Sequence, residues 1–465
     1  MAGIGFELKK ILNKQTFLDD ITAYVYSAVL SSGPWLMTII SLAVLGIYGG
    51  WIIGFREHEI FRSTVIYTYA FSLIFVGIIQ LVATRYLADR FYEKKSQITL
   101  ITFLTCTILL LSFGTLFSSI LYFFCKVSLL HKFLGIMLFL VVSMIWLCMI
   151  FLSAIKDYNS IINAFAAGAL ISIIACLKLG NYMGSEGFIL GYMLGQALTF
   201  FWLLARLLTE FPTGKLWDND FIPFFKKYWD LMLIGLIYNI AIWADKIVFW
   251  FAPDSRLIVP WFRTHDIYEA PVFFSYLTIV PTLAIFLIKL ETEFYKHYRQ
   301  YYGKVLGKKS MTDILQEKEL MINSLKRNIR QVFIIQGAVT ILCLIFSPEL
   351  VKMTQLTPIQ APLLRIALIG AFLQALLTIN IIIMFYFDLR KSVLAVATLF
   401  LSSNAGLSYL STQLGFQYYG YGYTFSCLLS LIFGFYILNI KLNDLEYITF
   451  SGQPVIIKKD QRSGA

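Results

Sequence analysis

Long apolar runs alternate with short polar and charged stretches along the whole chain. Most runs reach about 20 residues, the length that a helix needs to cross a bilayer. The pattern predicts an all-α polytopic membrane protein with twelve spanning helices. We expect them at residues 21–50, 64–88, 97–125, 133–155, 160–178, 186–208, 228–251, 267–290, 329–347, 362–387, 392–414 and 418–440.

Polar segments between and around these spans predict the domain organisation. We expect an amphipathic N-terminal segment on the membrane surface at residues 1–20, followed by an N-terminal six-helix bundle at 21–208. A cytoplasmic linker at 209–227 then leads to a C-terminal six-helix bundle at 228–440 and a cytoplasmic tail at 441–465. A charged loop, 291–328, interrupts the second bundle. Its Met321, Leu325 and Ile329 recur at helical spacing after a possible capping box, Ser310–Asp313. This loop is either a solvated surface helix or a docking face for a cytoplasmic partner.

The distribution of basic residues predicts the orientation of the chain. With the N-terminus inside, the inner segments carry 28 of the 38 Lys and Arg residues and the outer loops carry 8. The positive-inside rule then places both termini in the cytoplasm of a multi-pass protein of the cytoplasmic membrane. The net charge of +11 therefore reports topology rather than nucleic-acid binding, although basic loops can also hold anionic lipid.

Composition and motifs narrow the chemistry. Of all residues, 58% are hydrophobic and only 14% are charged, which excludes an ordinary soluble domain. The six cysteines and four histidines lack metal-site spacing, so no metal and no cofactor are expected. The sequence has no Walker-A motif, no Gly-x-Ser-x-Gly and no paired-carboxylate arrangement. We therefore expect a transporter rather than an enzyme.

The strongest candidate site lies in the apolar run 228–251. This run contains two adjacent charges, Asp245 and Lys246, together with Asn239 and Trp243. A charge in hydrocarbon is costly and usually faces a partner or a water-filled cavity. Adjacent helical residues point about 100° apart, so the two charges are not expected to neutralise each other. Lys246 either snorkels outward or lines the substrate path, and Asp245 either pairs with a neighbouring helix or lines the path.

Three further charged residues are candidates for the substrate path. Asp266 and Glu269 stand at the outer start of span 267–290. They are either an acidic pair at the mouth of the path that attracts a cationic substrate or carboxylates favoured by a helix N-terminus. Arg365, early in span 362–387, either meets an anionic headgroup or snorkels to the surface.

Helix breaks are expected where proline interrupts an apolar run. Gly33 and Pro34 interrupt the first span, and Pro281 lies within span 267–290. Because proline removes a backbone hydrogen bond, these positions are candidates for gating, with a packing kink as the alternative.

An internal repeat supports the division into two halves. Phe71-Ser72 and Phe91-Tyr92 recur as Phe274-Ser275 and Phe294-Tyr295, each 203 residues further on. Because each half has an even number of spans, both halves enter the membrane from the same side. This indicates two bundles related by a pseudo-two-fold axis along the membrane normal, with a central cavity between them.

Several segments resemble the PelG family of Pel exopolysaccharide transporters, within the multidrug/oligosaccharidyl-lipid/polysaccharide exporter (MOP) superfamily. The resemblance covers nearly the whole chain and rests on MAGIGFELKK at 1–10, SSGPW at 31–35, Trp243–Lys246 with Phe249-Trp250, Tyr268–Pro271, Pro281, Glu291–Phe294 with Tyr298 and Tyr301-Tyr302, Arg365 and Tyr386–Arg390.

The resemblance implies alternating access through the central cavity. It also implies a flippase-like exporter of an amino-sugar biofilm polysaccharide that works with a cytoplasmic glycosyltransferase and membrane regulatory subunits. Two alternatives stay open: an ion-coupled exporter of drugs or lipid-linked oligosaccharides, and a membrane scaffold that only docks the glycosyltransferase.

Overall fold

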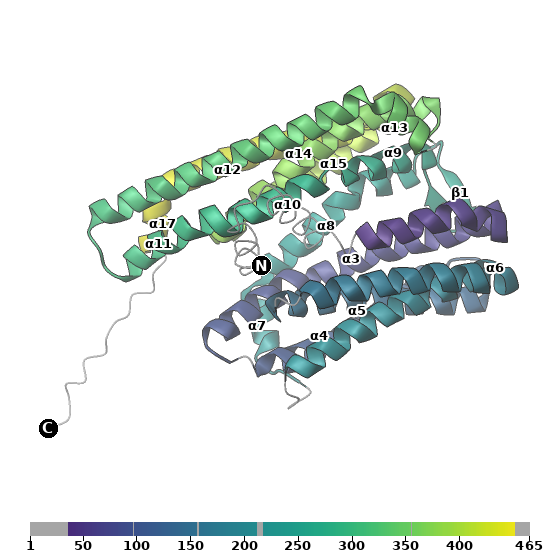
Figure 1. Cartoon of the computed structure of the whole chain (residues 1–465), viewed down its shortest axis with the longest axis horizontal. Coiled ribbons are helices and arrows are strands. Elements are labelled where there is room, and N and C mark those ends of the chain that lie inside the picture. Colours follow the sequence, from purple (N-terminus) through teal and green to yellow (C-terminus); the bar gives the residue numbers. More distant parts are fainter. Residues whose placement is uncertain (1–35, 96, 156–157, 212–216, 355, 452–465) are drawn as a thin grey trace, which may run out of the picture.

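Two helical lobes lie side by side in the computed structural model, which describes residues 36–451 except 96, 156–157, 212–216 and 355 (Figure 1). The Gly33-Pro34 position lies outside the described residues. Helices dominate because a backbone surrounded by lipid must satisfy its hydrogen bonds within each segment. The N-lobe comprises a helix at Leu36–Ile53, α3 (Phe55–Tyr92), α4 (Ile98–Phe123), α5 (Leu129–Ile155) and α6 (Tyr158–Glu210). The spans of the C-lobe are α8 (Trp229–Trp250), α9 (Asp266–Leu277) together with α10 (Val280–Lys289), α12 (Met311–Ile345), α14 (Ala361–Tyr386), α15 (Arg390–Leu414) and α16 (Tyr421–Asn443).

The described chain has 11 helices that are long and apolar enough to span a membrane, and one of them folds back on itself. Within α6, Gly184 has φ 59° and ψ −134°, a conformation open to glycine but strained for other residues. The two arms then run back against each other: a Cβ on Gly195 would lie 2.4 Å from the carbonyl oxygen of Gly168. Counting both arms gives the twelve membrane crossings that the hydropathy pattern predicts.

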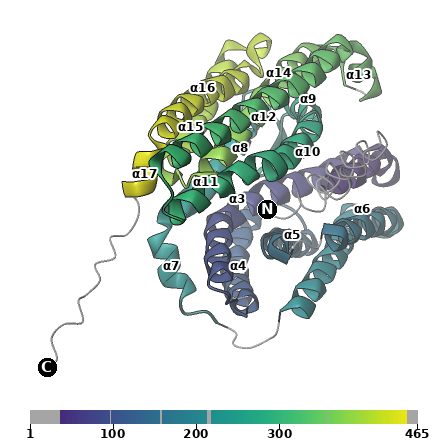
Figure 2. The same cartoon turned by 60° about the vertical axis from the view of Figure 1, so that its left-hand side comes forward.

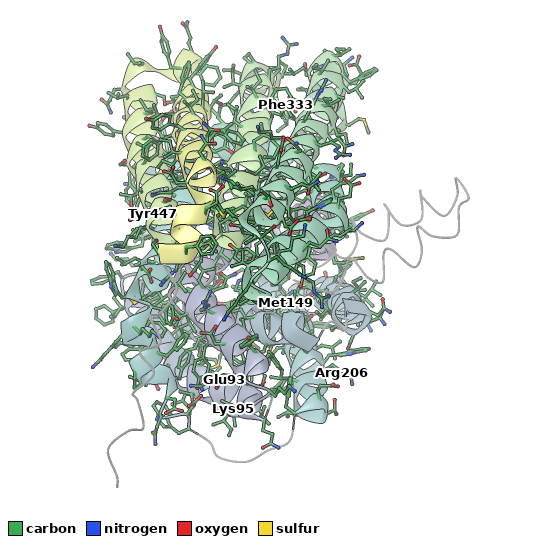
Figure 3. The ribbon with its side chains drawn as sticks, turned by 90° about the vertical axis from the view of Figure 1, so that its left-hand side faces the viewer. Glu93, Lys95, Met149, Arg206, Phe333 and Tyr447 are labelled. Carbon is green, nitrogen blue, oxygen red and sulfur yellow. The ribbon has the colours of Figure 1, made fainter. Side chains whose placement is uncertain are left out.

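Short elements gather at the two ends of the helical bundles. At one end, called the hairpin end, β1 (Arg256–Val259) pairs antiparallel with β2 (Phe262–Thr264) between α8 and α9. At the opposite end, called the linker end, α7 (Phe221–Lys227) precedes α8 in the segment that joins the lobes. Figure 3 looks onto this linker end, with Glu93 and Lys95 on the N-lobe and Tyr447 on the C-lobe. The remaining elements are η1 (Leu290–Phe294), α11 (Tyr295–Leu306), α13 (Ser347–Met353), η2 (Pro358–Gln360), η3 (Phe416–Tyr418) and α17 (Leu445–Ser451).

The predicted loop 291–328 is almost entirely helical. The π-helix η1 leads into α11, which packs against the first half of α12 (Figure 2). The Ser310 side chain caps α12 by accepting a hydrogen bond from the Asp313 backbone N–H at 3.2 Å. Met321 and Leu325 are buried. Helical spacing therefore identified this helix, although its continuity with the following span was missed because polar residues hid the junction.

The main contact between the lobes is the packing of α3 against α8. These helices cross at two glycines, where a Cβ on Gly235 would lie 2.1 Å from the carbonyl oxygen of Gly77. Close backbone approach at small residues is the usual way in which helices associate in lipid. The α3–α8 seam therefore holds the two lobes together along one side.

The linker is anchored to the N-lobe by a buried aspartate. Asp218 accepts hydrogen bonds from the hydroxyls of Tyr86 at 2.7 Å and Thr102 at 2.8 Å. Its backbone N–H donates to the Thr105 hydroxyl at 2.8 Å. The end of the linker nearest α7 is thus tied to α3 and α4 of the N-lobe.

Candidate functional site

A cluster of buried polar side chains lies inside the C-lobe, where four helices meet. Helix α8 supplies Asp245 and Lys246, and α9 supplies Tyr268 and Tyr276; the others are Asn404 from α15 and Tyr423 from α16. Asp245 is fully buried and Lys246 is 8% exposed. We call these six residues the charged cluster.

Asp245 is the acceptor at the centre of the charged cluster. Its Oδ2 accepts a hydrogen bond from the Tyr268 hydroxyl at 2.7 Å. Its Oδ1 lies 3.4 Å from the donating amide of Asn404, which also donates to the carbonyl oxygen of Ala241 at 2.9 Å. The carboxylate therefore ties α8 to both α9 and α15.

Lys246 turns back towards its neighbour, contrary to the expectation that the two charges cannot neutralise each other. Its Nζ lies 3.0 Å from Asp245 Oδ2. It also donates to the Tyr276 hydroxyl at 3.2 Å and to the Ile242 carbonyl at 3.1 Å. The four-carbon side chain of Lys246 is long enough to reach across the 100° that separates adjacent positions of a helix, so the angle between the two positions does not keep the charges apart. Lys246 does not snorkel to the membrane surface.

Aromatic rings complete the surroundings of the ammonium group. Nζ lies 4.9 Å from the Tyr276 ring centre, 5.6 Å from that of Tyr423 and 6.0 Å from that of Trp243. Ring faces attract cations, most strongly where water is excluded. A buried ion pair costs much desolvation, so breaking it by removing one partner is typically destabilising by about 3–5 kcal/mol.

A chain of polar contacts runs from the charged cluster to the hairpin end. The backbone N–H of Tyr268 donates to His265 Nδ1 at 3.3 Å, and His265 Nε2 lies 3.1 Å from Asp254 Oδ1. Tyr419 donates its hydroxyl to Asp254 at 2.8 Å. Partial burial opposes ionisation of Asp254, but the Tyr419 hydrogen bond and the nearby His265 outweigh it and lower the pKa of Asp254. This carboxylate is therefore ionised at neutral pH.

Two of the predicted path residues lie at the seam between the lobes. Asn239 donates to the Gly235 carbonyl at 2.8 Å and reaches α3, since a Cβ on Gly77 would lie 2.3 Å from its amide nitrogen. Trp243 packs further along the same side of α8, within an apolar cluster that includes Tyr67 and Trp250. The Tyr67 and Trp250 rings stack with centres 4.3 Å apart.

The lobes are also joined by charges at the hairpin end. Asp266 accepts from Arg62 of the N-lobe and, at 2.9 Å, from Arg256, and Arg256 also pairs with Glu59 of the N-lobe. We call these four residues the clasp. The clasp neutralises Asp266 with two guanidinium groups, so this carboxylate is engaged in holding the lobes together in this conformation.

Glu269 has a different environment from Asp266. It accepts from the Trp250 indole at 2.7 Å and from the His265 backbone N–H at 3.0 Å, at the N-terminus of α9. These contacts match the helix-terminus interpretation and fix the indole that stacks on Tyr67. Asp266 and Glu269 thus differ in their charged and aromatic partners, although both accept a hydrogen bond from the Thr264 hydroxyl, at 3.2 Å and 3.3 Å.

The remaining predicted residues lie apart from the charged cluster. Arg365 donates to the Ser347 hydroxyl at 2.8 Å, between α14 and α13. Helix α9 ends at Leu277, and α10 begins at Val280 after a short interruption of the helix. Pro281 is the second residue of α10. The fold therefore places neither Arg365 nor Pro281 beside Asp245.

Sequence reasoning missed the groups that satisfy the Asp245 carboxylate. Asn404 is an amide in the middle of an apolar span, a signal that could have marked it as a helix-bridging residue. Tyr268, Tyr276 and Tyr423 carry no local signal that separates them from the many other tyrosines of the chain, and only tertiary structure assigns partners to their hydroxyls and rings. In the part of the chain that the structure describes, no group of His, Cys, Asp or Glu side chains is placed to hold a metal ion.

Comparisons with known proteins identify the fold. A crystal structure of a MATE transporter in complex with MaL6 aligns with TM-score 0.64 at 14% identity, covering 90% of this chain and 97% of that one. An outward-facing multidrug-resistance MATE transporter of the MOP superfamily aligns with TM-score 0.62 at 15% identity, covering 90% and 96%. A MOP transporter from Pyrococcus furiosus, described as having a binding pocket of reverse polarity, aligns with TM-score 0.54 at 15% identity, covering 95% and 94%.

At the level of sequence, no curated protein matches the chain. The family model of PelG, described as "Putative exopolysaccharide Exporter (EPS-E)", matches residues 1–450. The members of this family and the structural neighbours are transporters rather than enzymes. The chain therefore belongs to the PelG family of exopolysaccharide exporters and has the two-lobe helical fold of the MOP superfamily.

Proposed function

We propose that this protein moves a Pel-type amino-sugar polysaccharide across the cytoplasmic membrane between its two lobes. The observation that carries the proposal is the match of the exporter family to residues 1–450, on a chain with the two-lobe fold of transporters. In the proposed orientation the linker end is cytoplasmic, which follows from the 28-to-8 excess of basic residues.

The contacts between the lobes suggest how the path opens. The α3–α8 seam runs through the membrane, whereas the clasp joins the lobes only at the hairpin end. Clasp side chains are partly exposed, and exposed ion pairs contribute about 0–1 kcal/mol each. The clasp is therefore weak enough to break and re-form during a transport cycle, with the seam as the axis of motion.

The charged cluster has a supporting role in this proposal. Asp245, Lys246 and their partners come from four helices of one lobe, so the cluster keeps the C-lobe rigid while the lobes move. Asp266, in the clasp that opens, remains our candidate for contact with the passing polymer, whereas Asn239 and Trp243 pack in the seam about which the lobes move.

The ion-coupled alternative makes a different demand on Asp245. A carboxylate that binds a coupling ion must be free to exchange it, but Asp245 already has the Lys246 ammonium at 3.0 Å. This contact favours the polysaccharide proposal without ion exchange at Asp245. The energy for export would then come from polymer synthesis by a partner glycosyltransferase.

Reconstitution tests the proposal. The protein would be placed in proteoliposomes with the partner glycosyltransferase and regulatory subunits of the same complex, and labelled nucleotide sugar would be added outside. We expect polymer that is protected from an added glycoside hydrolase only when this protein is present. Polymer that stays fully sensitive to the hydrolase, with synthesis intact, would support the scaffold alternative.

A further inference from the structure

A cavity of about 260 Å³ lies between α10 and α12, separate from the charged cluster. It is lined by Ile285 and Lys289 of α10 and by Gln331, Ile334 and Ile335 of α12. Ile334 is 56% exposed, so the cavity borders the outer surface of the bundle. Its walls are thus apolar along one part and polar at one end.

The polar end of the cavity offers unused hydrogen-bonding capacity. The Lys289 side chain is 23% exposed and its Nζ lies 2.8 Å from Glu293. Gln331 Oε1 is buried and accepts no hydrogen bond from the described residues. A buried polar atom without a partner costs free energy, so such an atom beside a cavity indicates a ligand or water.

Basic residues continue from this polar end towards the linker end of the molecule. Residues four apart share a helix face, so Arg327 lies one turn before Gln331 and Arg330 one turn before Ile334. Both arginines are exposed, and neither forms an ion pair with another described residue. Together with Lys289 they outnumber Glu293 and leave this region positively charged.

The helix on the other side of the cavity has an irregular backbone. Helix α10 starts after a break, with Pro281 at its second position, and ends at Lys289, where the π-helix η1 begins. π-helices are rare in proteins, and those that occur are often found at functional sites. The two irregularities confine α10 to ten residues and place Lys289 at its end, beside the cavity.

We propose that this cavity is a binding site for an anionic phospholipid. The phosphate would meet Lys289, Arg327 and Arg330, a headgroup hydroxyl or amine would donate to Gln331 Oε1, and an acyl chain would lie along Ile285, Ile334 and Ile335. The isoleucine wall does not suit a hydrated glycan or a small soluble anion, whereas a lipid matches both the charged end and the apolar wall. The assignment to the cytoplasmic leaflet, where anionic lipid attracts basic residues, rests on the orientation in the proposed function.

Native mass spectrometry of the purified full chain tests the site. The protein would be exchanged into phosphatidylglycerol or phosphatidylcholine, and the retained lipid would be compared for wild type and for Lys289→Gln/Arg330→Gln. We expect wild type to retain phosphatidylglycerol preferentially, and each removed charge to lower retention about fivefold, since a basic residue near the surface contributes about 1 kcal/mol. Lys391→Gln, at the start of α15, is the matched control and should bind like wild type.

A second variant tests the apolar wall. Ile335→Trp should fill the cavity and lower retention of phosphatidylglycerol even though every basic residue is kept. Equal retention of the two lipids by wild type, or unchanged phosphatidylglycerol binding by both variants, would overturn the proposal. Lipid retention is measured without transport, so its failure would leave the proposed export function untouched, and a failure of export would leave the lipid site untouched.

Discussion

At the scale of the residue, the Asp245–Lys246 pair depends on partners that the sequence does not reveal. The charges are adjacent in an apolar run, and that alone made Asp245 the strongest candidate. The Asp245 carboxylate is neutralised because the Lys246 side chain folds back towards it. It also accepts hydrogen bonds from the Tyr268 hydroxyl and the Asn404 amide, which lie 23 and 159 residues away in sequence. Hydropathy identifies a costly charge, but only packing shows what compensates it.

A double-mutant cycle measures this compensation. Asp245→Asn leaves a buried ammonium without its counter-charge, and Lys246→Met leaves a buried carboxylate, so each should lower stability by about 3–5 kcal/mol. The double variant should be more stable than the sum of the two losses predicts. Thermal unfolding in detergent measures all three, and strictly additive losses would contradict direct pairing of the two side chains.

At the scale of the element, related segments of the two halves have different shapes. Helix α3 is continuous from Phe55 to Tyr92, whereas its counterpart in the repeat is divided into α9, α10 and η1. The repeat and Pro281 indicated the relationship and an interruption, but not the π-helix at Leu290–Phe294. Such a local widening depends on what packs against the helix, and hydropathy does not record it.

The α3–α8 seam gives a prediction at this scale. Gly235→Ala places a methyl group 2.1 Å from the Gly77 carbonyl oxygen, so the helices must separate. We expect a lower melting temperature and reduced export. Gly406→Ala in α15 is the matched control because a Cβ there meets nothing within 4 Å. Similar losses for both variants would show that the effect comes from generic changes in helices rather than from the seam.

At the scale of the whole molecule, the apolar runs predicted more than single residues did. The count of twelve crossings followed from hydropathy, since each run must satisfy its backbone inside the bilayer. The seam and the clasp join residues about 160–200 positions apart, such as Gly77 with Gly235 and Arg62 with Asp266. Nothing in the local sequence encodes these contacts.

Orientation can be measured with single cysteines in a cysteine-free background. A cysteine at Ser310, between α11 and α12, should resist an impermeant thiol reagent in intact cells. A cysteine at Ser255, beside β1, should react, because the hairpin end is expected to face outward. Labelling at Ser310 together with protection at Ser255 would reverse the proposed orientation.

The most direct test of export by relative motion of the lobes is to lock the clasp. Cysteines at Arg62 and Asp266 would be joined by a short reducible thiol crosslinker in proteoliposomes that carry out synthesis and export. Cysteines at Ser128 and Glu186, which are hydrogen-bonded at 2.7 Å within the N-lobe, are the control pair. We expect the clasp crosslink to abolish hydrolase-protected polymer and reduction to restore it, while the control pair exports normally. Undiminished export through a fully crosslinked clasp would contradict transport by movement of the two lobes.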